Sequence, residues 1–394
     1  MKKTTNPDRK VRDVLQVAGL FVVTALTSAP AAASYIQTNL VSDVSGLAAF
    51  TDPNLVNPWG LSSSSTSPWW LSDNGTGVST LYNGNTGQPA SLVVTIPSPA
   101  GSPAGTKSTP TGQVFNGSSG FEIQPGAPAR FLFVTQDGTL SGWNPAANLT
   151  SAVLKVDNSA SGAAYTGLAL SGNFLYVANF SGGRIDVFDT TFAPTTLAGG
   201  FTDPNLPAGY VPFNIQNLGG ELYVTYAQVD SNGDEITGAG LGIVDVFDAD
   251  GNLLRRVATG GALNAPWGLA LAPSDFGEFS GDLLVGNFGD GLINALDPVT
   301  GQLLGQVADG LNNPIAIDGL WGIGFGNDGN AGPHNVLFFA AGIERETHGL
   351  FGSIAATTPS AVPEPGTLGL VAGIVPLLIW YGRRSRRLRA AVLT

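Results

Sequence analysis

Short apolar runs, separated by Gly, Asn, Asp and Pro, recur along residues 35–354. The runs are rich in Val, Leu, Ile, Phe and Tyr, a pattern typical of β-strands that end in turns. Pairs such as Asn83-Gly84 and Asp250-Gly251 favour tight hairpins between neighbouring strands. No segment of this region keeps the period of an amphipathic helix. The pattern therefore predicts an all-β body.

The apolar runs repeat in six units of about fifty residues. The positions predicted to be equivalent in the first strand of each unit are Leu61, Phe121, Leu168, Ile215, Leu269 and Ile323. Four short strands per unit, arranged radially, leave only protected sheet edges. We therefore predict a six-bladed β-propeller of four-stranded blades over residues 34–356. A seven-bladed ring and a pair of β-sandwiches are the alternatives.

The ring must close on itself. The last unit ends at Ile354 without an outermost strand, whereas residues 35–41 form a spare apolar strand before the first unit. We expect this N-terminal strand to pair into the final blade. Residues 97–120, rich in Ser, Pro, Gly and Thr, are expected to form a surface loop.

The first 33 residues have the organisation of a signal peptide. Basic residues extend to Arg12, an apolar stretch follows over 14–26, and small residues come next. Ala31 and Ala33 fit the cleavage site for signal peptidase. The alternative is an uncleaved membrane anchor, but the apolar stretch is short for a span.

The last 33 residues have three parts. A linker (357–365) ends in Pro363-Glu364-Pro365, an uncharged apolar segment (366–382) follows, and an arginine-rich tail (383–394) completes the chain. The apolar segment is at the lower limit for a transmembrane helix. The tail contains Arg383, Arg384, Arg386 and Arg387. Because clustered arginines stay in the cytoplasm, the body is expected outside it.

This order of elements resembles the PEP-CTERM sorting signal of Gram-negative bacteria. The resemblance implies processing near the motif by an exosortase, after which the protein is released or attached to surface polysaccharide. The expected partners are signal peptidase and exosortase, with extracellular polysaccharide as a further candidate. The expected route crosses the inner membrane, with transient anchoring by the C-terminal helix, and ends at the cell surface or outside the cell. A plain C-terminal anchor is the alternative.

Charge and composition narrow the function classes. The whole chain has a formal charge of -12, and most basic residues lie at its two ends. Residues 34–361 contain seven Lys and Arg against 26 Asp and Glu, a formal charge of -19. Such an acidic body repels phosphate backbones, which argues against nucleic-acid binding. The absence of cysteine excludes disulfides, zinc–thiolate sites and thiol catalysis.

One column of polar residues is a candidate site. Asp73, Asn179 and Asn287 follow the second apolar run of three units, at the end expected to face the channel. Together with Glu344 they could form a channel-mouth site for a metal or ligand, because hard cations such as Ca²⁺ prefer converging carboxylate and amide oxygens. The alternative is turn chemistry, since Asn and Asp beside Gly bond their own backbone. No other cofactor is evident.

Two further features have structural interpretations. The segment 230–235 begins like a calcium loop, but it lacks the expected Gly at its sixth position and an acid at its twelfth. We interpret it as an acidic hairpin. His334 and His348 show no metal-ligand spacing, and no Gly-x-Ser-x-Gly nucleophile elbow occurs in a strand-turn-helix context. Both are expected in turns or caps, and a Ser-His-Asp triad is the alternative.

The body also resembles a family of exported propeller proteins with PEP-CTERM tails. The similarity spans residues 35–354 and includes Asn57-Pro58-Trp59-Gly60 and Asn287-Phe288-Gly289-Asp290-Gly291. More distantly, it resembles six-bladed NHL-repeat and gluconolactonase-like proteins. The first function hypothesis is therefore an exported binding or scaffolding propeller without evident chemistry. The second, implied by the distant resemblance, is a divalent-metal-dependent lactonase acting at the channel.

Overall fold

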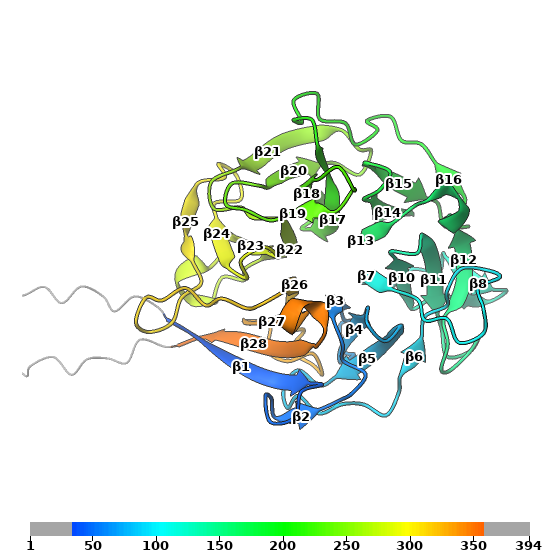
Figure 1. The fold of residues 1–394 in the computed structure, drawn as a ribbon, viewed down its shortest axis with the longest axis horizontal. Coiled ribbons are helices and arrows are strands. Elements are labelled where there is room, and N and C mark those ends of the chain that lie inside the picture. Colours follow the sequence, from blue (N-terminus) through cyan, green and yellow to red (C-terminus); the bar gives the residue numbers. More distant parts are fainter. Residues whose placement is uncertain (1–33, 358–394) are drawn as a thin grey trace, which may run out of the picture. The chain divides into compact units, whose positions relative to one another are not determined.

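The computed structural model describes residues 34–357. The predicted signal peptide with Ala31 and Ala33, the sorting motif 363–365, the apolar segment 366–382 and the tail 383–394 lie outside the described residues. Six antiparallel sheets surround a central axis in the described part (Figure 1). The predicted six-bladed β-propeller is therefore confirmed. Within residues 34–357, none of the helical segments has the length and apolar character that a membrane crossing requires.

Each blade has four strands in order from the axis outwards. The inner strands are β3 (Pro58–Ser62), β7 (Pro110–Phe115), β13 (Tyr165–Ser171), β17 (Tyr210–Leu218), β22 (Pro266–Leu271) and β26 (Leu320–Phe325). The second strands are β4 (Trp69–Asp73), β10 (Phe131–Thr135), β14 (Phe174–Asn179), β18 (Glu221–Val229), β23 (Leu283–Asn287) and β27 (Val336–Ala341). The third strands are β5 (Val78–Tyr82), β11 (Thr139–Trp143), β15 (Arg184–Phe188), β20 (Ile243–Phe247), β24 (Ile293–Leu296) and β28 (Leu350–Ala356). The outer strands are β6 (Val94–Thr95), β12 (Val153–Asp157), β16 (Pro194–Thr195), β21 (Leu253–Thr259), β25 (Leu303–Gln306) and β1 (Tyr35–Ser42).

A few short elements complete the fold. The strand β2 (Phe50–Thr51) runs parallel to β1, and β19 (Glu235–Ile236) pairs with β18. A hairpin of β8 (Glu122–Gln124) and β9 (Ala127–Pro128) lies between β7 and β10. The helical turns are η1 (Ser159–Ser161), η2 (Gly277–Phe279) and α1 (Ile343–Glu346).

The N-terminal strand closes the ring, as predicted. β1 pairs antiparallel with β28, with Tyr35 opposite Ala356 and Ser42 opposite Leu350 (Figure 1). The side chain of Tyr35 continues the seam, because its hydroxyl donates a 3.1 Å hydrogen bond to the Phe276 carbonyl of the fifth blade. The final sheet therefore contains both ends of the described chain.

Blade 2 differs from the prediction. Its inner strand is β7, so the position of Leu61 in blade 1 is taken by Gln113, not by Phe121. The surface loop predicted over 97–120 is therefore wrong at residues 110–115, which form β7, whereas 116–120 are irregular. The strand has polar side chains that bond neighbouring backbone: Thr111 Oγ1 donates to the Tyr165 carbonyl at 2.7 Å. Because polar side chains occupy this strand, its sequence contains no apolar run, although most of β7 is buried.

The core consists of apolar clusters between adjacent blades. One joins Leu132 and Val134 of blade 2 to Leu168 and Val177 of blade 3, and equivalent clusters fill the other seams. Both faces of every sheet are therefore covered. This burial stabilises the ring without disulfides, since the chain has no cysteine.

Candidate functional site

Glycine lets the inner strands approach closely around the axis. Five inner strands have Gly at the same register, and a Cβ there would lie 2.2–2.7 Å from the next blade. These residues are Gly60, Gly112, Gly167, Gly268 and Gly322. In blade 4 the position is Asn214, whose side chain instead donates a 2.8 Å hydrogen bond to the Trp267 carbonyl. The channel is therefore narrow at this level.

Aromatic side chains fill the end of the channel where the inner strands begin. Trp59 and Trp321 stack at 3.5 Å between centroids, and Trp267 meets both edge-on. Phe180, Phe213 and Phe288 complete this cluster. The indole of Trp321 donates to Asn57 Oδ1 at 3.2 Å. These rings come from blades 1, 3, 4, 5 and 6, and all but the partly buried Phe288 are buried, so they close the axis at this end.

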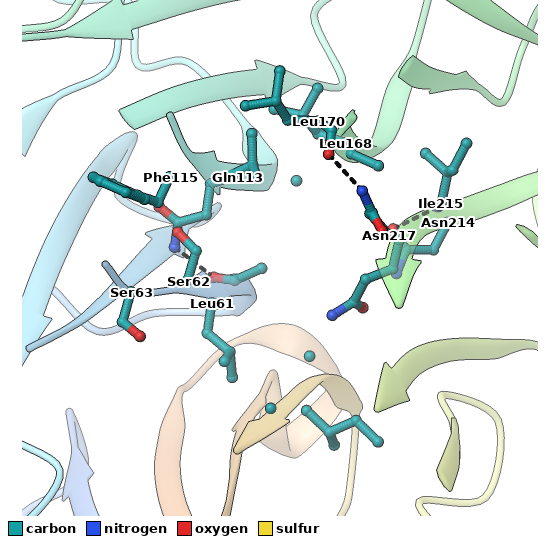
Figure 2. Close-up of a pocket in the computed structure, with 18 of the residues that line it drawn as sticks. Leu61, Ser62, Ser63, Gln113, Phe115, Leu168, Leu170, Asn214, Ile215 and Asn217 are labelled. Atoms are coloured by element: carbon teal, nitrogen blue, oxygen red, sulfur yellow. Dashed lines mark hydrogen bonds between the residues drawn. The ribbon is translucent and has the colours of Figure 1, made fainter. Parts of the chain in front are cut away.

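The opposite part of the channel is a cavity of about 430 Å³. Its lining comes mainly from the inner strands (Figure 2). It includes Trp267 of the aromatic cluster. The polar side chains that line it are Ser62, Ser63, Gln113, Asn214, Gln216 and Asn217. No Asp, Glu, His, Lys or Arg is among its lining residues in the described chain. The cavity therefore offers neutral hydrogen-bonding groups between apolar walls.

Some of these polar groups are fixed by the protein and others are free. Asn217 Nδ2 donates to the Leu170 carbonyl at 3.0 Å, and Gln113 Nε2 donates to the Gly60 carbonyl at 2.9 Å (Figure 2). The side chains of Gln216 and Ser63 make no hydrogen bond within residues 34–357. These two groups are therefore available to a ligand.

The structure places the predicted column outside this cavity. Asp73, Asn179 and Asn287 are the last residues of the second strands in blades 1, 3 and 5, opposite the beginnings of their inner strands. All three are buried, and none lines the cavity. The common register of the three positions is as predicted.

The two Asn side chains are engaged within their own blades. Asn179 Nδ2 donates to Asp186 at 2.7 Å, and its Oδ1 accepts from the Gly182 amide at 3.0 Å. Asn287 Nδ2 donates to the Ala262 carbonyl at 2.8 Å. These contacts are those of turn-stabilising residues.

Glu344 lies elsewhere, in the left-handed turn α1 with φ of 53°. Its side chain is largely exposed, and its carboxylate is 3.9 Å from the imidazole Nε2 of His348. No cluster of three or more His, Cys, Asp or Glu with metal-binding geometry occurs within the described range 34–357.

The segment 230–235 forms a hairpin, as predicted. Asp230 Oδ1 accepts hydrogen bonds from the amides of Asn232 and Asp234, at 2.7 and 3.1 Å. These bonds lower the pKa of the Asp230 carboxyl. Burial raises the pKa of Glu235, which lies at the base of the hairpin in β19.

Both histidines lie in turns beside acids. His334 Nδ1 is 2.8 Å from Asp328, and His348 Nδ1 is 2.6 Å from Asp43. These acids raise the pKa of each imidazole. His348 lies two residues before β28, so its contact with Asp43 connects the start of β28 to the segment that follows β1. The prediction of turn and cap positions is confirmed.

The sequence and the fold were compared with those of known proteins. No family model matches the sequence. An uncharacterized protein of Acanthamoeba polyphaga mimivirus is 35% identical over 333 residues, which cover 80% of this chain and 78% of that protein.

Two solved structures are similar in fold. A protein of unknown function from Bacteroides thetaiotaomicron superposes with a TM-score of 0.52 at 13% identity, covering 82% of this chain and 76% of that one. A gluconolactonase from Xanthomonas campestris superposes with a TM-score of 0.37 at 16% identity, covering 58% and 83%. At 13% identity the similarity to the Bacteroides thetaiotaomicron protein concerns the fold alone.

Proposed function

The chain belongs to the same family as this mimivirus protein, and we propose that it is an exported propeller that binds a neutral, hydroxyl-rich ligand in its channel cavity. The ligand class that fits best is a short saccharide segment, as found at the ends or branches of extracellular polysaccharides. Fold alone assigns no function, so the proposal rests on the cavity.

The observation that carries the proposal is the neutral lining of the cavity. Ligand pockets typically combine apolar walls with a few polar groups that orient the ligand. Here Leu61, Phe115 and Leu170 supply apolar surface, whereas Gln216 and Ser63 supply unpartnered amide and hydroxyl groups. The volume of about 430 Å³ lies within the usual range for small-molecule sites.

Charge selects between saccharide classes. The formal charge of -19 over residues 34–361 repels anionic polymers such as uronic-acid-rich chains. No basic side chain among the lining residues of the described chain offsets this repulsion inside the cavity. A neutral saccharide is not repelled by the acidic body and needs no basic side chain in the cavity.

A lactonase reaction in this cavity has less support. Hydrolysis of this type requires a general acid or base, or carboxylates that hold a metal. The described lining supplies neither kind of side chain. The binding hypothesis is therefore the better supported of the two.

Export and sorting remain part of the proposal. The order of signal peptide, Pro363-Glu364-Pro365, apolar segment and arginine tail supports export followed by exosortase processing. Replacing the three motif residues by Ala, in a host with an exosortase, is expected to leave an unprocessed membrane-bound form. Unchanged release of the variant would count against this route.

Binding is tested by screening neutral and acidic oligosaccharides, followed by calorimetry on the best one. We expect a neutral saccharide to bind, and Gln216→Ala to weaken it at least about tenfold, since a lost ligand hydrogen bond costs about 1.4 kcal/mol or more. Gln302→Ala makes the same chemical change on the exposed outer edge of blade 5 and should leave affinity unchanged. Binding of acidic saccharides alone, or equal affinity of both variants, would contradict the proposal.

A further inference from the structure

The chain contains the same hexapeptide twice. Phe-Thr-Asp-Pro-Asn-Leu occurs at residues 50–55 and again at 201–206. The first copy leads into the inner strand of blade 1 and the second into that of blade 4, on opposite sides of the ring (Figure 1). In each copy the Asp accepts a hydrogen bond from the amide of the Asn, at 2.9 Å for Asp52 and 2.8 Å for Asp203. The two segments therefore share the Asp–Asn turn, although Phe50 lies in β2 and Phe201 has a φ of 51°.

Blade 4 shows how this buried Asp is neutralised. The guanidinium of Arg256 contacts Asp203 and also pairs with Asp245 at 2.9 Å. The side chains of Asp203 and Asp245 are 2% and 0% exposed. Two buried carboxylates thus share one protein cation, because an unpaired buried charge is costly.

The register gives the corresponding positions in blade 1. Leu71 of β4 lies opposite Leu61 and Thr80, as Val224 of β18 lies opposite Ile215 and Asp245. Thr80 therefore takes the place of Asp245. Two residues further along the second strand, Asp73 takes the place of Tyr226. Blade 1 therefore also has two neighbouring aspartates, Asp52 and Asp73. Asp73 comes from the second strand, whereas Asp245 of blade 4 comes from the third.

The blade 1 pair is enclosed and has no cation. Asp73 is 0% and Asp52 is 9% exposed. The hexapeptide packs on the turn that follows Asp73, where Thr76 Oγ1 donates to the Asn54 carbonyl at 2.6 Å. Tyr82, on the same face, donates to Asp52 Oδ2 at 3.0 Å. No Lys, Arg or His within residues 34–357 forms an ion pair with either carboxylate.

The carboxylate oxygens of Asp73 are buried without hydrogen-bond partners within residues 34–357. Neither oxygen has a hydrogen-bond partner of ordinary geometry within the described chain, and the buried Thr80 hydroxyl also lacks one. Burial and the nearby Asp52 raise the pKa of Asp73, although Thr80 approaches it and opposes the shift. A fully buried carboxylate with both oxygens unpartnered indicates a positively charged ligand.

We propose that Asp52 and Asp73 bind a divalent hard cation, such as Ca²⁺, at the position corresponding to that of the Arg256 guanidinium in blade 4. The two carboxylates match its charge, and carboxylate oxygens are ligands that Ca²⁺ prefers. The hydroxyl of Thr80 is the third candidate ligand. This site lies between blade 1 and its entry segment, apart from the channel cavity and from Asn179 and Asn287. It fastens the first blade to the ring.

Thermal unfolding of the full chain with Ca²⁺ or with a chelator tests this proposal. Ca²⁺ should raise the Tm of the wild type by about 5 °C, because a ligand of the folded state stabilises it by mass action. Metal analysis after gel filtration should find one Ca²⁺ per chain. Asp73→Asn and Asp52→Asn should abolish both effects while the β-sheet circular dichroism is retained.

Asp203→Asn is the matched control, because it removes the equivalent acid where Arg256 already supplies the charge. Its Tm should fall, yet its Ca²⁺-induced rise should equal that of the wild type. Identical Tm values of the wild type in Ca²⁺ and chelator, without retained metal, would overturn the proposal. In that case, if Asp73→Asn had a higher Tm than the wild type at pH 8, Asp52 and Asp73 would share a proton instead of binding a cation. If Asp73→Asn fails to fold, the metal content of the wild type and its Tm change with chelator still test the cation site.

Discussion

Trp59 of the first blade and Trp321 of the last stack face to face, with ring centroids 3.5 Å apart. The two residues are separated by almost the whole propeller in sequence, yet they occupy the same register, each directly before a glycine of the axial ring. The stack therefore joins the beginning and the end of the ring at its axis, as β1 joins them at its rim.

Removing this aromatic contact should destabilise the ring. Trp321 is fully buried and contacts four other aromatic rings, so Trp321→Ala is expected to cost about 3–5 kcal/mol in the free energy of unfolding. Trp321→Phe should cost less. The control Leu311→Ala removes a side chain that is 83% exposed and should change little. Denaturant unfolding measures all three, and an unchanged midpoint for Trp321→Ala would contradict the axial role.

The ring closure gives a second prediction, at Tyr35. Tyr35→Phe removes the hydrogen bond donated to the Phe276 carbonyl and the one accepted from the Phe279 amide, and should cost about 1–2 kcal/mol. Tyr35→Ala also removes packing on Phe276 and Phe279 and should cost about 3–5 kcal/mol. Equal stabilities of the two variants would show that the aromatic packing contributes nothing. Unfolding by denaturant distinguishes these cases.

The axial glycines give a third prediction. A Cβ on Gly322 would lie 2.7 Å from the Trp59 carbonyl oxygen, which belongs to a neighbouring strand and cannot move freely. Gly322→Ala should therefore lower stability by about 1–3 kcal/mol through overpacking. At Gly310 the same change meets only the Ser34 side chain at 3.6 Å and should be nearly neutral. A neutral Gly322→Ala, measured beside this control, would contradict the close packing of inner strands.

The pH dependence of stability gives a fourth prediction. Burial, with a contribution from Glu235, raises the pKa of Glu346 to about 7 in the folded protein. The folded state thus holds this proton more tightly than the unfolded state, in which Glu titrates near its ordinary pKa of about 4.3. The resulting stability is present at low pH and is lost as the pH rises towards about 7. Glu346→Gln should therefore stabilise the protein at pH 8 more than at pH 4.5, as measured by Tm.

Much of the architecture could be predicted from the sequence, because each blade repeats apolar strands whose faces are buried against neighbours. The closing role of residues 35–41 followed from a missing outer strand. Blade 2 was assigned incorrectly because β7 is buried with polar side chains that bond neighbouring backbone, so its apolar signal is weak. The rule that buried strands are apolar fails where side chains such as Thr111 and Gln113 are paired.

The candidate cavity could not be predicted for a related reason. Two of its polar groups without a partner, those of Gln216 and Ser63, come from different blades and share no sequence pattern. Asp73 was singled out, but its partner is Asp52 of the preceding segment, not Asn179 or Asn287 of other blades. The repeated hexapeptide was the available signal, since identical segments at 50–55 and 201–206 predict equivalent environments.

The central claim is that a neutral saccharide occupies the channel cavity. A crystal structure of the protein soaked with the tightest-binding neutral oligosaccharide tests it most directly. We predict ligand density between the inner strands, with a sugar hydroxyl within about 3 Å of the Gln216 amide. Density on the outer surface of the blades, with the cavity holding only water, would contradict the account.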